Sequence, residues 1–230
     1  MGAQAAPDRE TMMQELRNRN GQFVWEASEK AYVVLQAARK VFFEHGYFAA
    51  TTDMIQREAG VSKSTLYQHY RNKEGMLSAV IVWTCTNHSL QASLEAITGE
   101  TLRERLICAA RLYLDLLLQS ETVSLLRVIV EVSRQFPDLN ALFFDSGPGC
   151  AQRVVEDILE RAAQAGEIAL SPAGIAQAST LFKSMVRAEH YFEYLLFPGR
   201  RLAAGELDAW AALAVDSFLA AFGKGHSAGH

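Results

Sequence analysis

The chain has 230 residues, of which 50% are apolar and 21% are charged, as in ordinary soluble globular proteins. Its formal net charge is −4, so the chain as a whole lacks the excess of cationic groups that drives non-specific binding to nucleic acid. No N-terminal segment has the pattern of a secretion signal, and no run reaches the roughly 18 apolar residues of a membrane span. We therefore expect a cytoplasmic protein without a membrane partner.

The charge is unevenly distributed along the chain. Residues 1–75 hold ten Lys and Arg against nine Asp and Glu, for +1, whereas residues 76–230 hold twelve against seventeen, for −5. The three cysteines, Cys85, Cys108 and Cys150, are widely spaced and odd in number. This pattern suggests neither a disulfide framework nor a metal site, and we expect no cofactor.

Residues 1–26 are polar and of mixed charge, and we expect a flexible N-terminal arm. A frayed terminus is the simpler interpretation, and an arm that enters the DNA minor groove is the alternative. A helix is predicted next, because Leu35, Ala38 and Phe42 recur at helical spacing and Gly46 follows near its end.

A short helix is predicted after this first one. Thr51 and Thr52 are favourable N-cap residues, and Ile55 and Ala59 lie four residues apart on the inward face. Gly60 ends the short helix, because glycine adopts a left-handed conformation without steric cost.

A second short helix begins after Ser62, which is again a favourable N-cap residue. Leu66 and Tyr70 are four residues apart and point inward, which leaves an outer face rich in hydrogen-bond donors. That face consists of Lys63, Ser64, Thr65, Tyr67, Gln68 and His69. The helix forms a rod of roughly 10 Å, which suits a major groove about 12 Å wide. Residues 27–75 are therefore predicted to form a DNA-binding helix-turn-helix domain.

Helical patterns dominate residues 76–222, and no stretch shows sustained strand alternation. Helices are predicted at about 76–97, 101–119, 121–134, 138–165, 172–196 and 206–222. Thr101 and Glu104 have the spacing of a capping box, and the segment 147–149, Gly-Pro-Gly, predicts a break in the fourth of these helices. Residues 223–230 are expected to be a disordered tail. The predicted fold class is all-α, with a helix-turn-helix domain followed by a helical regulatory and dimerisation domain.

The N-terminal pattern resembles TetR-family transcriptional regulators over about residues 30–80. The residues that carry the resemblance are Leu35, Ala37, Ala38, Phe42, Gly46, Thr51, Thr52, Ile55, Ala59, Gly60, Val61, Ser62, Lys63, Leu66, Tyr67, His69, Tyr70 and Lys73. A later segment, from Leu125 to Pro148, is similar to the ligand-binding half of members that control multidrug-efflux genes. The resemblance implies a homodimer joined through the last two helices, a palindromic double-stranded DNA operator, repression, and release by a small hydrophobic effector.

The resemblance also implies roles for individual side chains. Residues expected near phosphates or the DNA backbone are Thr51, Thr52, Tyr67, His69 and Lys73. Residues expected to face base edges are Lys63, Ser64, Thr65 and Gln68, types that read purine edges or serve as general hydrogen-bond partners. Ala50 and Asp53 depart from the family pattern. Since an aspartate would repel phosphate, we expect Asp53 to stabilise the positive end of its own helix.

The larger domain holds side chains suited to a small-molecule site, which is usually an apolar cavity with a few polar groups. The candidates are Trp83, Cys108, Tyr113, Arg127, Glu131, Phe144, Phe182 and His190. Aromatic residues at helical spacing are more often ordinary core, so each keeps that alternative. The apolar stripes of residues 172–196 and 206–222 likewise suit either pairing with a second copy or packing within one chain.

Three other interpretations stay open at this point. A helical corner of this kind can be purely structural. An enzyme is not favoured, because the sequence has no glycine-rich phosphate loop, metal-spaced histidine pair or nucleophile elbow. The third is a DNA-binding dimer controlled by a protein partner or by oxidation of Cys108 or Cys150.

Overall fold

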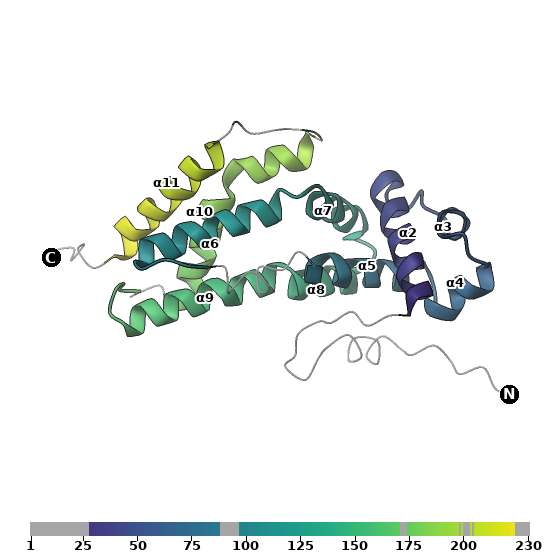
Figure 1. Ribbon diagram of the computed structural model, residues 1–230, viewed down its shortest axis with the longest axis horizontal. Helices are drawn as coiled ribbons and strands as arrows, with labels where there is room; N and C mark the ends of the chain where they lie inside the picture. Colours follow the sequence, from purple (N-terminus) through teal and green to yellow (C-terminus); the bar gives the residue numbers. More distant parts are fainter. Residues whose placement is uncertain are drawn as a thin grey trace. The chain divides into compact units, whose positions relative to one another are not determined.

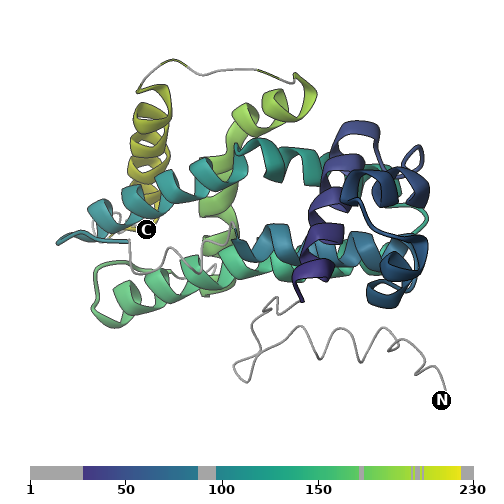
Figure 2. The same ribbon diagram turned by 45° about the vertical axis from the view of Figure 1, so that its right-hand side comes forward.

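The computed structural model describes residues 28–87, 97–170, 174–197 and 205–223, together with 199 and 203. These residues are mainly helical (Figure 1, Figure 2). The one β-type pairing among them is an isolated antiparallel bridge between Ile168 and Gly223. The predicted all-α fold class is therefore confirmed. The expected arm, 1–26, and residues 224–230 of the expected tail lie outside the described part of the chain.

The observed helices follow the predicted order. They are α2 (Glu29–His45), α3 (Thr52–Ala59), α4 (Lys63–His69), α5 (Lys73–Asn87), α6 (Leu102–Leu117), α7 (Ser120–Val132), α8 (Pro137–Ser146), α9 (Pro148–Gln164), α10 (Gly174–Leu196) and α11 (Glu206–Phe222). The predicted break at residues 147–149 is confirmed, because Gly147 separates α8 from α9. The helix expected to run to about residue 97 is described only as far as Asn87, and residues 88–96 lie outside the described ranges.

Side-chain caps determine where several helices begin. The hydroxyl oxygens of Thr51 and Ser62 each accept a hydrogen bond from the backbone N–H three residues further on, at 3.2 and 3.1 Å. Both predicted caps are therefore confirmed, whereas Thr52 is not a cap but the first residue of α3. The predicted capping box of Thr101 and Glu104 is present at the start of α6.

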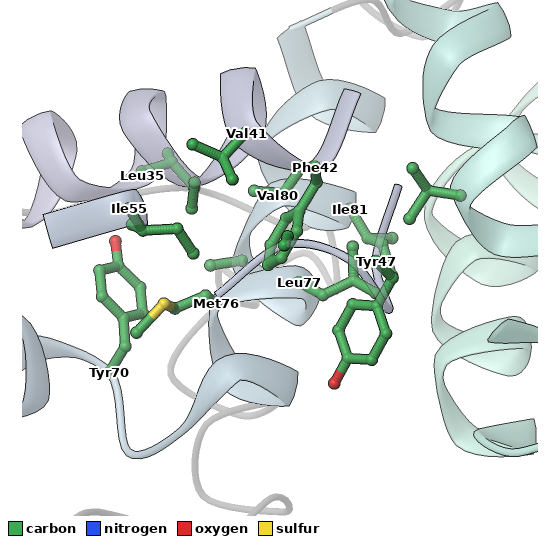
Figure 3. Packing of buried hydrophobic residues seen from close by; sticks show 14 of the residues in the cluster. Leu35, Val41, Phe42, Tyr47, Ile55, Tyr70, Met76, Leu77, Val80 and Ile81 are labelled. Carbon is green, nitrogen blue, oxygen red and sulfur yellow. The ribbon is translucent and has the colours of Figure 1, made fainter. Parts of the chain in front are cut away.

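The chain forms two compact units, and the first comprises Met1–Asn87 and Ser124–Gly147. Its core contains fully buried side chains from α2 to α5, among them Leu35, Phe42, Ile55, Leu66 and Met76, several of which are drawn in Figure 3. Burial of each is worth roughly 1.5–3 kcal/mol, so this core holds the short helices α3 and α4 in place. The unit extends past residue 75, because α5 packs against α2 and α8 packs against α5.

The second unit comprises His88–Val123 and Pro148–His230. Its helices α6, α9, α10 and α11 surround a separate core. Phe182 of α10 and Phe218 of α11 meet edge to face within this core, with ring centroids 5.2 Å apart.

Helix α10 is interrupted at Ala188, whose φ of 41° and ψ of −154° are rare for any residue with a side chain. The interruption lies close to a contact with α11. The indole Nε1–H of Trp210 donates a hydrogen bond to the carbonyl oxygen of Val186, at 2.9 Å.

Candidate DNA-binding surface

The corner between α3 and α4 depends on one left-handed residue. Gly60 has φ 65° and ψ 26°, and its N–H donates to the carbonyl of Arg57 at 3.3 Å. A Cβ at this position would have no neighbour within 4 Å, so the need for glycine is conformational and not steric. Ile55 before the corner and Leu66 after it are fully buried, as predicted.

Tyr70 fixes the end of α4 against α2. Its side chain is buried, and its hydroxyl donates a hydrogen bond to the carbonyl oxygen of Ala31 at 2.8 Å. Burial raises the pKa of Tyr70 well above its usual range, because the phenolate would lose its hydration. With Leu66 and Tyr70 both held inward, the opposite face of α4 points away from the core of this unit.

The residues predicted to contact DNA are all at least partly accessible. Those classed as exposed are Thr51, Lys63, Ser64, Tyr67 and Gln68. Those that are half-buried are Thr52, Thr65, His69 and Lys73. All nine belong to the first unit, and their contact with DNA stays a prediction.

Two side chains of α4 turn toward the first turn of α3. The Lys63 ammonium lies 2.8 Å from a carboxylate oxygen of Asp53, and the Tyr67 hydroxyl donates to Thr52 Oγ1 at 3.3 Å. Lys63 and Tyr67 are four residues apart and so share one side of the helix. Asp53 was expected only to stabilise the positive end of its own helix, but its carboxylate is also the ion-pair partner of Lys63.

The next side of α4 carries neutral hydrogen-bonding groups. The Ser62 hydroxyl lies 2.7 Å from Ser64 Oγ and 2.8 Å from Thr65 Oγ1, so three hydroxyls form a chain at the start of the helix. Gln68 is exposed, and its amide has no hydrogen-bond partner among the described residues. Ser64 and Gln68 are four residues apart and are thus the pair that is best placed to meet an external partner.

A second ion pair lies on the same helix-turn-helix. The Lys40 ammonium of α2 is 2.7 Å from a carboxylate oxygen of Glu58 on α3. In both pairs the carboxylate raises the pKa of the lysine, first through a hydrogen bond and then through its charge. Lys63 in turn lowers the pKa of Asp53. Both lysines are therefore charged at neutral pH, and each is balanced by a neighbouring acid.

Glu131 of α7 binds the turn that precedes α3. Its two carboxylate oxygens accept hydrogen bonds from the backbone N–H groups of Tyr47 and Phe48, at 2.8 and 3.0 Å. The neighbouring Gly46 has φ 76°, and a Cβ there would come within 2.8 Å of the same carboxylate. The backbone conformation therefore favours glycine, and a side chain at this position would also displace the end of the Glu131 side chain.

Lys73 lies next to this turn. Its ammonium is 4.3 Å from the centroid of the Tyr47 ring, a cation–π distance. Partial burial lowers the pKa of Lys73, while the charge of Glu131 acts in the opposite sense. Burial, together with the charge of Glu74, raises the pKa of Tyr47 to about 12.

The eight candidates for a ligand site fall into two groups. Trp83, Arg127, Glu131 and Phe144 belong to the first unit, and Cys108, Tyr113, Phe182 and His190 to the second, where the His190 side chain lies outside what the structure describes. Several have other evident roles. The Glu131 carboxylate holds a backbone turn, Arg39 stacks 4.8 Å from the ring of Trp83, and Phe182 is core.

Two contacts on this surface were not predicted from the sequence. The Asp53–Lys63 ion pair could have been predicted, because the two opposite charges lie on either side of a predicted tight corner. The binding of Glu131 to Tyr47 joins residues 84 positions apart, and no local pattern indicates it.

The described ranges also bear on metal sites, disulfides and membrane spans. These residues contain no group of three or more His, Cys, Asp or Glu arranged to hold a metal ion. The three cysteines, all of which are described, form no disulfide. No helix in the described part of the chain is both long and apolar enough to cross a membrane.

Comparison with known proteins identifies both halves of the chain. The model described as bacterial regulatory proteins, tetR family, matches residues 34–80, and the model described as AefR-like transcriptional repressor, C-terminal domain, matches residues 104–224. The Escherichia coli (strain K12) HTH-type transcriptional regulator UidR is 37% identical over 49 residues, which are 21% of this chain. That match spans a quarter of UidR, 25% of its length.

Two solved structures extend the similarity over most of the chain. A TetR-family transcriptional regulator from Mesorhizobium loti MAFF303099 has a TM-score of 0.76 at 23% identity, over 84% of this chain and 96% of that one. The flavonoid-responsive regulator FrrA has a TM-score of 0.69 at 30% identity, over 86% of this chain and 99% of its own. The matched C-terminal model alone covers more than half of the 230 residues. The protein therefore belongs to the TetR family of bacterial transcriptional regulators.

Proposed function

We propose that this regulator is a homodimeric repressor that binds a palindromic DNA operator through α4 and is released by a small hydrophobic ligand. The observation that carries the DNA-binding part is the polar, accessible face of α4, held outward by the buried Leu66 and Tyr70. The rod is short enough to enter a major groove about 12 Å wide. Repression is the action named by the C-terminal family model. Because chromosomal DNA is the proposed partner, the proposed location is the cytoplasm.

Base reading is assigned mainly to Ser64 and Gln68. Gln68 has a free amide that is able to pair with an adenine edge, and the Ser64 hydroxyl serves as donor or acceptor. Thr51, Thr52, Tyr67, His69 and Lys73 are proposed to position the domain on the sugar-phosphate backbone. These contacts orient the helix but carry no sequence information themselves.

Pairing of two copies is supported by exposed apolar side chains on α10 and α11. Leu181, Phe192 and Leu196 of α10 and Leu213 of α11 all expose large apolar surface, and Phe192 and Leu213 are 57% and 56% accessible. Other positions of the same helices bury Phe182 and Phe218 in the unit's own core. The two helices thus expose large apolar side chains in addition to those of their own core, which suits a two-fold interface.

A small-molecule effector is supported by the similarity to FrrA, whose name describes a response to flavonoids. We propose that the effector contacts candidates of the larger domain such as Cys108 and Tyr113 of α6. Tyr113 is buried, and Cys108 is half-buried on the same helix. To release DNA, the ligand must bind the free conformation more tightly than the DNA-bound one.

The test begins with selection of bound fragments from the source genome by the purified protein. Fluorescence anisotropy with a selected fragment and a scrambled duplex then measures specific and non-specific affinity. We expect a symmetric site, weaker discrimination by Gln68→Ala, and dissociation of the dimer by Leu213→Glu in sedimentation. Equal binding by wild type and a Lys63, Tyr67, Lys73 triple alanine variant would contradict the DNA-binding assignment. Loss of binding on addition of flavonoids tests the effector, and peroxide tests control by oxidation.

A further inference from the structure

The ion pair between Asp53 and Lys63 spans the corner of the helix-turn-helix. Asp53 is the second residue of α3, and Lys63 is the first residue of α4. Their charged atoms are 2.8 Å apart, although both side chains are more than half accessible to solvent. An exposed pair of this kind adds little to stability, so its main consequence is where it places the ammonium.

Lys63 is the one lysine or arginine within α4. A free ammonium at this position would be attracted to the phosphates of any duplex, because that attraction does not depend on sequence. Asp53 neutralises this charge and holds it toward α3. The outer face of α4 then presents mainly neutral groups, led by Ser64 and Gln68, which bind well only when matching base edges are present.

We infer that Asp53 is a specificity-determining positioning residue, which keeps the Lys63 ammonium away from the phosphates of DNA that lacks the operator sequence. This inference rests on the proposed DNA-binding function. On the operator the pair is able to stay intact, because an ammonium has three N–H donors and Asp53 uses one of them. The remaining donors are then available to a base acceptor that lies close to the pair.

The neighbouring contact between α4 and α3 supports this arrangement. Tyr67 lies one turn after Lys63, and its hydroxyl bonds to Thr52, the residue next to Asp53. The same side of α4 is therefore tied twice to the first turn of α3. Both contacts thus direct the Lys63 side chain toward the first turn of α3.

The experiment compares wild type with Asp53→Asn, which keeps the shape of the side chain and removes its charge. Affinity for a scrambled duplex is expected to rise about three- to tenfold, and the salt dependence of that binding to steepen by about 0.9 for each ammonium that reaches a phosphate. Affinity for the operator is expected to stay the same or fall. The ratio of the two affinities should therefore decrease about three- to tenfold, and Asp53→Glu should restore it.

Glu58→Gln is the matched control, because it removes the acid of the other ion pair on α3 and releases Lys40. If this variant raises non-specific affinity as much as Asp53→Asn does, the effect reflects net charge and the inference is overturned. The double variant Asp53→Asn, Lys63→Gln is expected to bind scrambled DNA as Lys63→Gln does. An increase that persists without Lys63 would also overturn the inference.

Lys63→Gln alone gives an independent readout if Asp53→Asn fails to fold. We expect its operator affinity to fall, while its salt dependence on scrambled DNA stays unchanged. A decrease of that dependence by about one would show that Lys63 already contacts phosphates, against the inference. Failure of the proposed function itself would appear differently, as wild-type protein that does not distinguish the operator from scrambled DNA.

Discussion

Replacement of Glu131 by alanine tests whether α7 supports the DNA-binding turn. The substitution removes the acceptor of two backbone N–H groups, those of Tyr47 and Phe48. Phe48 is exposed, so water replaces its lost hydrogen bond, whereas the N–H of the buried Tyr47 is less readily hydrated. One hydrogen bond to a charged group contributes about 1.5–3 kcal/mol. Since Glu131 itself is exposed, we expect a loss of about 1.5 kcal/mol in the free energy of unfolding.

Urea denaturation measures this loss, and amide hydrogen exchange locates it. Exchange at residues 47 and 48 should accelerate in Glu131→Ala, whereas the rate at the buried Ile55 should change only in proportion to global stability. Glu44→Ala, an exposed substitution in the same unit, is the control and should stay within about 0.5 kcal/mol of wild type. Unchanged stability together with unchanged exchange at residues 47 and 48 would refute the role assigned to Glu131.

The helix-turn-helix was predictable because its determinants are local. The caps at Thr51 and Ser62, the left-handed Gly60 and the inward pair Leu66 and Tyr70 all act over three to five residues. Each of these requirements restricts the residue type strongly, so their combination indicates one structure. The helix boundaries further along the chain followed from glycine and proline for the same reason.

Contacts between distant segments were not predictable in this way. The sequence predicts Glu131 as one of the polar groups of a small-molecule site. Its partners are backbone N–H groups 83 and 84 residues earlier, and a backbone group leaves no mark in the sequence. The inclusion of α8 in the first unit depends on the same kind of distant packing, here against α5.

The side chains of α4 show where local prediction reaches its limit. Helical periodicity separates the buried Leu66 and Tyr70 from the outer residues, but it does not distinguish among the outer residues. The structure divides them further, because Lys63 and Tyr67 bond to α3 while Gln68 does not. Residues that the sequence pattern places on the same outer face therefore differ in whether their polar groups are free to bind another molecule.

Three further substitutions test local features. Tyr70→Phe removes the hydrogen bond to Ala31, and should lower stability by about 0.5–1.5 kcal/mol in urea denaturation. Glu104→Gln should lower the unfolding midpoint at neutral pH, because backbone N–H groups of the folded state lower the pKa of this carboxyl. The ionised Glu104 carboxyl stabilises the folded state above its usual pKa of 4.5, and this stabilisation is lost as the pH falls through the lower pKa of the folded protein. The unfolding midpoints of wild type and Glu104→Gln should therefore become equal in acid. Ala188→Gly should stabilise the protein by about 1 kcal/mol, since relief of a strained positive φ, worth about 1–3 kcal/mol, exceeds the entropic cost of glycine. Ala212→Gly, in the regular helix α11, should instead destabilise it, and a loss of stability in both variants would show that Ala188 is unstrained.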